Sequence, residues 1–306
     1  MAADEGGTLR IQGKFFEVSG VSGGRGNPDP PKRGAVTTFS DASRRRMVRL
    51  IARLGDAVPI FVTLTYGKEW PHDPRVWEVH RTTWFKRLAY LHPSYSAVWR
   101  LEPQKRGAPH YHLLLYGGFL DWKWLARSWA ECTGDTSPEH LAAGTKVEKL
   151  RSAKGAAFYA SKYMAKSVLE ELPDYWSRPG RWWGVHNRAN LPFAPERSVT
   201  LSKLQRDQLM SFFRSQVERK LWAKVAAEYG GFVPPGLEDE AKLDKWVVPK
   251  VMLSEPDEFL RSFSGYFSDY VWSQTCKRFP GVDEARIAPK VREFIDSQLE
   301  SFARIA

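Results

Sequence analysis

The sequence predicts an α+β protein built on an antiparallel ferredoxin-like or RRM-like sheet with helices on one face, followed by a mainly helical C-terminal region. The hydrophobic patterns between residues 58 and 166 run in the order strand, helix, strand, strand, helix, strand and helix. After residue 207, apolar residues recur at helical spacing along three stretches. We therefore expect a flexible Gly/Pro-rich arm over residues 1–43, a sheet domain over 44–206 and a helical region over 207–306.

A basic helix is expected to follow the N-terminal arm. Arg44, Arg45 and Arg46 open it, and Gly55 is placed to end it. Its apolar residues follow helical spacing: Met47, Leu50, Ile51 and Leu54. The basic face of this helix could contact phosphate groups, although simple exposure to solvent is the more common role of such a face.

The next segments predict a strand, a helix and a hairpin. Residues 59–66 are rich in β-branched and aromatic side chains, which favours a strand. Asp73 and Pro74 then have the pattern of an N-cap followed by proline at the first helical position. One face of this helix carries Trp77, Arg81, Trp84, Leu88 and Leu91. Residues 95–102 alternate as a second strand, and residues 110–116 form a third strand after a turn.

The rest of the sheet domain is expected to add a helix, a strand and a second helix. Asp121 caps a Trp-rich helix that reaches about Cys132, and residues 145–150 are a candidate fourth strand. A helix over residues 155–166 follows this strand. Residues 197–201 are a further strand candidate. The Pro- and Trp-rich residues 173–196 are interpreted as a loop that either lies on a substrate or packs on the surface.

The basic charge is concentrated in the first two thirds of the chain. The formal net charge is +11 at pH 7. Residues 1–206 hold 32 Lys and Arg against 19 Asp and Glu, whereas residues 207–306 hold 14 against 16. A polyanion is the natural partner for such an excess. Trp and Tyr residues among the basic ones suit stacking on unpaired bases, although a solvated basic surface over core aromatics also fits this composition.

Some classes of protein are disfavoured by what the sequence lacks. The longest apolar runs fall far below the about 18 residues needed to cross a membrane, and the polar N-terminus has no secretory h-region. Cys132 and Cys276 lie far apart and outside any CxxC pattern, which fits a reduced cytoplasm. We therefore expect a cytoplasmic protein with no membrane association. The GxxxxGK[ST] phosphate loop of an ATP-driven motor is absent from the sequence.

Candidate metal ligands lie on the predicted hairpin. His110 and His112 are two residues apart on a strand, so they share a face while the intervening residue points into a core. If the hairpin turns around Arg106, Glu102 pairs opposite His110 and lies on the same face. Two imidazoles and a carboxylate form a three-ligand set that leaves room for solvent or substrate. The matched carboxylate favours this set over a merely exposed histidine pair.

Two tyrosines are the candidate nucleophiles. Tyr159 and Tyr163 lie one turn apart on one face of the expected helix over 155–166. Lys162 and Lys166 each follow a tyrosine by three residues. A free tyrosine has a pKa near about 10, and a nearby cation favours the phenolate and can hold a phosphate. An amphipathic helix with its tyrosines in the core and its lysines in water is the plainer alternative.

Together these segments resemble a known family. The stretch Phe61-Val-Thr-Leu-Thr-Tyr66, the stretch Pro109-His-Tyr-His112 with an upstream Glu, and Tyr159-x-x-Lys-Tyr163 match in order and spacing the three motifs of HUH endonucleases. The sequence is most similar to the two-tyrosine class of rolling-circle replication initiators, the Rep proteins of plasmids and single-stranded DNA phages. The resemblance covers roughly residues 58–200, and it implies that residues 44–206 are an HUH endonuclease domain.

The resemblance implies an enzyme that nicks DNA and transfers the cut strand. His110, His112 and Glu102 would hold Mg²⁺ or Mn²⁺, which polarises the scissile phosphate. One tyrosine would attack the phosphorus and keep the 5′ end as a phosphotyrosine, while the released 3′-OH primes synthesis. After one round the other tyrosine would attack, and strand transfer would close a circle. Lys162 and Lys166 would stabilise the phenolates or the phosphoryl charge, unless they simply face solvent.

The resemblance also implies partners. Single-stranded DNA and origin DNA would be the substrates, in the cytoplasm of a bacterial or archaeal host. A host helicase and a host polymerase would continue from the nick. Candidate DNA-binding residues are basic or aromatic side chains of the basic helix, the hairpin turn and the Trp-rich loop: Arg44, Arg45, Arg46, Lys105, Arg106, Arg181, Trp182 and Trp183.

Other functions remain open at this point. A transposase or relaxase would use the same chemistry on a different DNA end. A non-catalytic nucleic-acid-binding module on the same sheet would need neither the histidines nor the tyrosines. A zinc hydrolase with two His and one Glu would let water attack, although the HExxH and HxxEH helical patterns of such enzymes are absent from the sequence.

Overall fold

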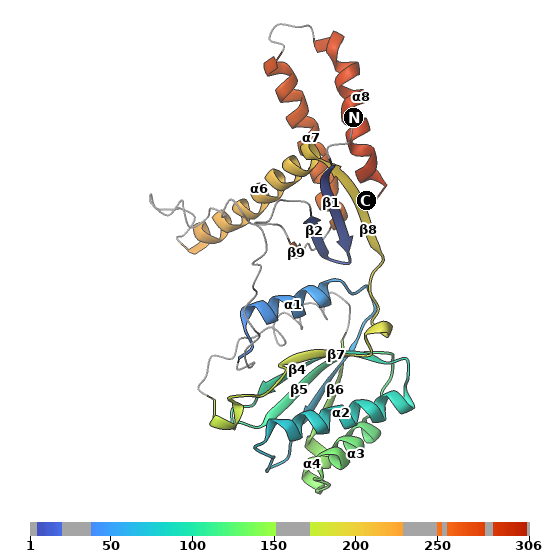
Figure 1. The fold of residues 1–306 in the computed structure, drawn as a ribbon, viewed down its shortest axis with the longest axis vertical. Coiled ribbons are helices and arrows are strands. Elements are labelled where there is room, and N and C mark those ends of the chain that lie inside the picture. Colours follow the sequence, from blue (N-terminus) through green and yellow to red (C-terminus); the bar gives the residue numbers. More distant parts are fainter. Residues whose placement is uncertain are drawn as a thin grey trace. The chain divides into compact units, whose positions relative to one another are not determined.

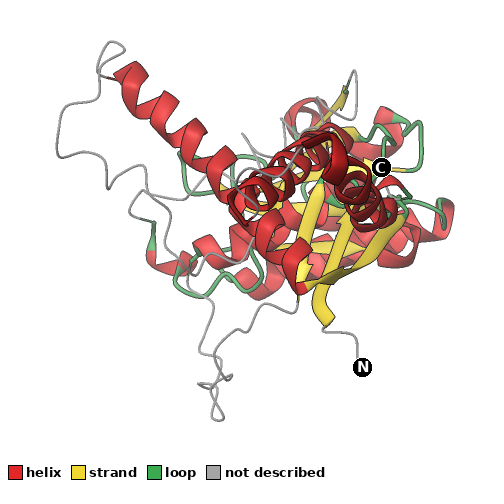
Figure 2. Cartoon of the chain, turned by 90° about the horizontal axis from the view of Figure 1, so that it is seen from above, coloured by secondary structure: helices red, strands yellow, loops and turns green. Residues whose placement is uncertain are grey.

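The structure, a computed structural model, divides the chain into two compact units (Figure 1). One unit is Asn27–Pro195, and the other combines Met1–Gly26 with Glu196–Ala306. The described residues are 5–19, 38–150, 172–228, 250–252, 256–278 and 284–304. Helices and antiparallel strands make up most of them, which confirms the predicted α+β class (Figure 2).

A five-stranded antiparallel sheet forms the centre of the Asn27–Pro195 unit. Its strands lie in the order β6-β3-β5-β4-β7. The bounds are β3 Ile60–Thr65, β4 Ser96–Pro103, β5 Pro109–Tyr116, β6 Thr145–Lys149 and β7 Trp183–His186. The first four strands along the chain interleave two β-α-β units, as the ferredoxin-like pattern predicts, and β7 extends the sheet beyond β4.

The helices α2, α3 and α4 lie on one face of this sheet (Figure 1). Their bounds are α2 Pro74–Leu91, α3 Trp122–Thr133 and α4 Pro138–Ala143. Asp73 caps α2 and Asp121 caps α3, each by accepting a hydrogen bond from a backbone N–H of the first turn. Trp77, Trp84 and Trp129 have no exposed surface and fill the core between these helices and the sheet. Both caps and both long helices were expected from the sequence.

The helix α1 (Asp41–Ala52) lies against the other face of the sheet (Figure 1). Ser40 caps it by accepting from Ser43 N, so the helix begins three residues before Arg44. The Arg100 guanidinium of β4 lies 4.5 Å from the ring centroid of Phe39, which precedes the helix. Trp183 Nε1 of β7 donates to Ser43 Oγ at 2.9 Å. The basic helix is therefore partly packed on the sheet and adds to the helices expected on one face.

The second unit contains an antiparallel sheet in the order β8-β1-β2-β9. Its strands are β1 Glu5–Gln12, β2 Phe15–Ser19, β8 Glu196–Ser202 and β9 Lys250–Met252. The helices α6 Lys203–Glu228, α7 Pro256–Arg278 and α8 Glu284–Ala303 complete the unit and confirm the helical C-terminal region. Within the described part of the chain, the helices are all too short or too polar to cross a membrane.

The expectation of an irregular arm over residues 1–43 is wrong for the N-terminal hairpin and for the start of α1. Leu9, Ile11, Phe16 and Val18 have no exposed surface, because they face the core that the C-terminal helices provide. The strand expected at 197–201 is present as β8, but it pairs with β1 in this second sheet. The boundary expected at residue 207 falls inside α6, because the core of this unit begins at β8.

The buried position of Phe16 generates a prediction about stability. Phe16→Ala removes a fully buried side chain from the core of the second unit, so we expect the free energy of unfolding to fall by about 3–5 kcal/mol. Arg10→Ala, at an exposed position of β1, is the control and should change it by less than about 0.5 kcal/mol. Chemical denaturation measures both variants. Equal stability of the two would contradict a structural role for the hairpin.

Candidate active site

Three neighbouring strands bring together the histidines and the glutamate that the sequence singled out. Glu102 of β4 pairs directly opposite His110 of β5, which is the register expected from a turn around Arg106. On the other side of β5, Thr65 pairs with His110 and Thr63 pairs with His112. Residues directly opposite each other in an antiparallel pair project on the same side. The two histidines, Glu102 and the two threonines therefore share one face of the sheet, which we call the histidine face.

Each histidine ring contacts a threonine hydroxyl through Nδ1. Thr65 Oγ1 lies 2.7 Å from His110 Nδ1, and Thr63 Oγ1 lies 3.4 Å from His112 Nδ1. On the other side of its ring, His112 Nε2 lies 3.2 Å from Glu102 Oε2. The two rings are 4.4 Å apart between centroids and nearly perpendicular. The threonines thus direct Nδ1 toward β3 and leave Nε2 on the opposite side of each ring.

Burial keeps His110 neutral. It lowers the pKa of His110 from 6.5 to about 3, and repulsion from His112 acts in the same direction while attraction to Glu102 opposes it. Gln104 Nε2 also lies 3.4 Å from His110 Nδ1. The neutral imidazole is the form that binds a metal ion, so protonation does not compete with a ligand at this ring near pH 7.

A buried arginine compensates the charge of Glu102. Arg100 has no exposed surface, and its Nη2 lies 3.9 Å from Glu102 Oε1. Burial alone would raise the pKa of Glu102, but the hydrogen bond from His112 and the attraction of Arg100 outweigh it and lower this pKa. Burial lowers the pKa of Arg100 as well, yet a guanidinium stays charged in proteins. The histidine face therefore carries an ionised carboxylate over a buried cation.

The chemistry of these donors fits a divalent cation. An imidazole that donates its Nδ1–H to a threonine keeps a lone pair on Nε2, and the carboxylate adds negative charge beside it. Among the residues that the structure describes, no group of three His, Cys, Asp or Glu side chains is already arranged around one point. As the side chains lie, Glu102 is hydrogen-bonded to the His112 nitrogen that a metal ion would need.

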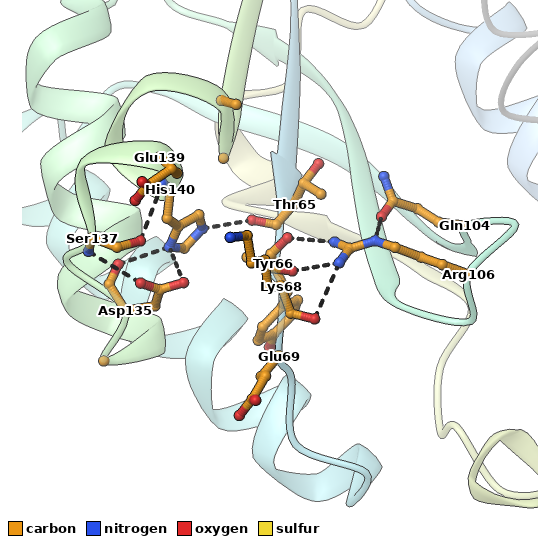
Figure 3. Close-up of a pocket in the computed structure, with 14 residues that line it drawn as sticks. Thr65, Tyr66, Lys68, Glu69, Gln104, Arg106, Asp135, Ser137, Glu139 and His140 are labelled. Carbon is orange, nitrogen blue, oxygen red and sulfur yellow. Dashed lines mark hydrogen bonds and ion pairs between the residues drawn. The ribbon is translucent and has the colours of Figure 1, made fainter.

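A pocket of about 710 Å³ adjoins the histidine face (Figure 3). Thr65 and Gln104, which contact His110, also line this pocket. Arg106 reaches across from the hairpin turn and donates to Tyr66 O at 2.6 Å and to Gly67 O, and its Nε donates to Gln104 Oε1 at 3.0 Å. The guanidinium therefore ties the loop after β3 to the hairpin, and Arg106 is largely engaged inside the protein.

The opposite wall of the pocket is held by a buried histidine. The Nδ1 atom of His140 lies 2.7 Å from Asp135 O, and its Nε2 lies 2.9 Å from Thr65 O (Figure 3). A Cβ atom at Gly67 would lie 2.0 Å from the Asp135 carboxylate, and one at Gly144 would lie 2.1 Å from the His140 ring. The backbone approaches this histidine so closely that only glycine fits at both positions. His140 thus fixes the end of β3, which carries Thr65.

The predicted DNA-binding cations differ in their availability. Arg45, Arg46, Lys105 and Arg181 are exposed. Arg44 forms an ion pair with Asp41 at 2.9 Å. The exposed cations come from α1, the hairpin turn and the segment before β7, so they lie on elements that adjoin the histidine face.

The two tryptophans predicted to stack on bases are packed in the protein. The segment 173–196, interpreted as a loop, contains the 3-10 helices η2 Asp174–Trp176 and η3 Arg188–Asn190 and the strand β7. Trp182 is only 2% exposed and stacks on Trp176 in the core, so its assignment as a DNA-binding residue is wrong. Trp183 is half-buried, and its Nε1 is bonded to Ser43. Of the two roles left open for this segment, packing against the domain is the one observed.

The predicted nucleophiles cannot be placed on this face. Tyr159, Tyr163, Lys162 and Lys166 lie outside the described residues. The strand that precedes them, β6, pairs with β3, whose threonines contact the histidines. Sequence reasoning in turn missed Thr63, Thr65 and Arg100. The alternation of the two threonines along their strand, which matches that of the histidines, was the available signal.

The burial of His110 generates a prediction about pH. In the metal-free protein we expect this ring to stay neutral above about pH 4, because its pKa lies near 3. A lowered histidine pKa means that the unfolded chain binds the proton better. The contribution of His110 to stability is therefore complete above pH 6.5 and is lost as the pH falls from 6.5 toward 3. An NMR titration, with His110→Gln for assignment, measures it, and a ring that titrates near pH 6.5 would contradict this environment.

Comparison with known proteins links this region to replication. Residues 59–168 match the family of replication-associated proteins described by the name ORF2. The matched stretch is about a third of the chain, and it contains β3, β4, β5, β6 and both predicted nucleophiles. No curated protein and no solved structure matches the chain significantly. The part of the chain that carries the histidine face is thus similar to replication-associated proteins.

Proposed function

We propose that this protein is a replication initiator that nicks single-stranded DNA at an origin and rejoins the strand to end rolling-circle replication. The observation that carries the proposal is the histidine face, where His110, His112 and Glu102 meet with Thr63 and Thr65 behind the rings. The match to replication-associated proteins favours a replication origin over the end of a transposon as the DNA that is cut.

In the proposed reaction a tyrosine of the segment after β6 is the nucleophile. Tyr159 or Tyr163 loses its phenolic proton, and its oxygen attacks the scissile phosphorus. The new phosphorus–oxygen bond replaces the bond to the 3′ oxygen, which leaves and takes up a proton to become a 3′-OH. The 5′ end stays on the protein as a phosphotyrosine ester, so the phosphodiester is exchanged rather than hydrolysed. The other tyrosine then attacks the regenerated junction, and the bound end closes a circle.

The remaining residues have positioning and electrostatic roles in this proposal. His110, His112 and Glu102 would hold Mg²⁺ or Mn²⁺, whose contribution when bound is Lewis-acid polarisation of the scissile phosphate. Thr63 and Thr65 hold the two rings with Nε2 available, which is the usual role of groups behind metal-binding histidines. Lys162 and Lys166 would stabilise the phenolate or the phosphoryl charge.

The proposed partners follow from the same chemistry. Exposed cations on α1, in the hairpin turn and before β7 would contact phosphates of the DNA: Arg45, Arg46, Lys105 and Arg181. A host helicase would open the duplex and a host polymerase would extend the 3′-OH, since the sequence carries no phosphate loop of its own.

The decisive experiment traps a covalent adduct. We expect the wild type, incubated with Mn²⁺ and a labelled single-stranded origin, to give a labelled protein band on a denaturing gel. With Tyr159 as the first nucleophile, Tyr163→Phe should still nick and form the adduct but should release no closed circle. The double variant with Tyr159→Phe should form no adduct. An adduct in the double variant, or cleavage by water without any adduct, would overturn the tyrosine mechanism.

A second test examines the metal assignment without changing a ligand. Thr65→Val keeps the shape of the side chain but removes the hydroxyl that lies 2.7 Å from His110 Nδ1. We expect Mn²⁺ binding to weaken by about 10- to 100-fold, because the ring loses the group that fixes its orientation. Thr65→Ser should keep the affinity, and Thr82→Val at an exposed position of α2 is the control. Calorimetric titration with Mn²⁺ measures all of them. Unchanged affinity in Thr65→Val would sink this role of Thr65.

A further inference from the structure

A second surface with aromatic and basic side chains lies on the other side of the sheet. A groove of about 490 Å³ runs between α2 and α3, the helices that cover the face opposite the histidines (Figure 1). Lys86 and Tyr90 line it from α2, and Trp124 and Arg127 line it from α3. We call this surface the α2–α3 groove.

An ion pair between the two helices fixes the floor of the groove. Arg87 of α2 pairs with Glu131 of α3, and its Nη1 also donates to Ser128 O at 3.4 Å. Below them, Trp84 Nε1 donates to Ser128 Oγ at 3.1 Å in the core. Lys86 and Tyr90 are one helical turn apart, as are Trp124 and Arg127, so each helix presents one cation and one aromatic ring to the groove.

The aromatic side chains of the groove are unusually accessible. Tyr90 is 87% exposed and Leu91 beside it is 49% exposed, while Trp124 is half-buried. Large apolar side chains gathered on a surface mark a site of interaction more often than single ones do. An exposed tyrosine ring on a firmly packed helix offers a flat face on which a planar group can stack.

The charges of the groove select a negatively charged occupant. Glu131 is the carboxylate that lines it, and Arg87 neutralises that group. Lys86 and Arg127 are exposed, and neither forms an ion pair with any residue in the described part of the chain. Farther along α3, Lys123 Nζ lies 5.7 Å from the ring of Trp122, which is 61% exposed. Cations alternating with accessible rings are the pattern of a surface that binds a single-stranded nucleic acid.

We propose that the α2–α3 groove is a second binding site for single-stranded DNA, away from the nicked phosphate. An unpaired base stacks on Tyr90, and the flanking phosphates contact Lys86 and Arg127. This inference rests on the proposed function, because that function supplies the single strand. The groove and the histidine face lie on opposite sides of the sheet, so only a strand long enough to pass around an edge reaches both.

The experiment compares two matched double variants of the full chain. Tyr90→Ala with Lys86→Ala removes one ring and one cation from the groove. Phe119→Ala with Lys149→Ala removes the same kinds of group from exposed positions outside it. Fluorescence anisotropy with a labelled thymidine oligonucleotide of about 40 nucleotides, several times one site of about 4–16, measures binding at several salt concentrations. Because all four positions are exposed, both variants should fold.

The expected result is a loss that is confined to the groove variant and to long DNA. Affinity for the long oligonucleotide should fall at least about fivefold, since one stacked base contributes on the order of 1–3 kcal/mol. The salt slope should shrink by about 0.7, the value for one phosphate contact on a single strand. The control variant should match the wild type in both measurements. Nicking of a short origin oligonucleotide of about 10 nucleotides, within one site, should be unchanged in both variants.

Other outcomes would overturn the inference. Wild-type affinity and salt slope in the groove variant would exclude DNA from the groove. If the variant instead alters self-association in sedimentation while binding DNA normally, the groove is a protein interface. Failure of the nicking proposal looks different: the wild type then forms no covalent adduct, yet the groove variant still loses affinity for long DNA.

Discussion

The register of the β4–β5 hairpin is the constraint on which the histidine face depends. The turn is closed by the bonds from Gln104 N to Ala108 O at 2.9 Å and from Gly107 N to Gln104 O at 2.8 Å. Gly107 has a φ of 85°, which other residues rarely adopt, and a Cβ atom there would lie 2.4 Å from the Tyr175 hydroxyl. A slip of one residue would turn the histidines into the packed face and expose Tyr111. The turn therefore decides which side of the sheet can do chemistry.

The two faces of the sheet separate packing from polar contacts. Tyr111 and Leu113 of β5 are buried on the face that α2 and α3 cover, and Tyr111 donates to Trp77 O at 3.2 Å. The histidines between them on the same strand are half-buried and contact hydroxyl and carboxylate groups. A rigid apolar layer on one side thus holds the strand that positions polar side chains on the other. Arg100 is the exception, because it is a fully buried cation on the polar side.

Local patterns in the sequence were enough for the sheet domain and for part of its site. The pairing of Glu102 with His110 follows from the length of one turn, and it could be counted from the sequence. The threonine contacts could not be derived in this way, because they join residues 45 and 49 positions apart on strands whose register no turn sets. Composition also could not separate Trp182, which is in the core, from an exposed stacking residue. The N-terminal hairpin was missed because its partner strand lies beyond the whole sheet domain.

That last pairing has a consequence for how the chain is made. Leu9 of β1 pairs with Val199 of β8, so the second unit cannot close until nearly two thirds of the chain has left the ribosome. At about 5–20 residues per second, β8 follows β1 after about 10–40 s. All strands of the five-stranded sheet are synthesised within that interval, so the inserted domain can fold first. Meanwhile the apolar side chains of the N-terminal hairpin wait without a partner strand, which makes this segment the natural client of a chaperone that acts during translation.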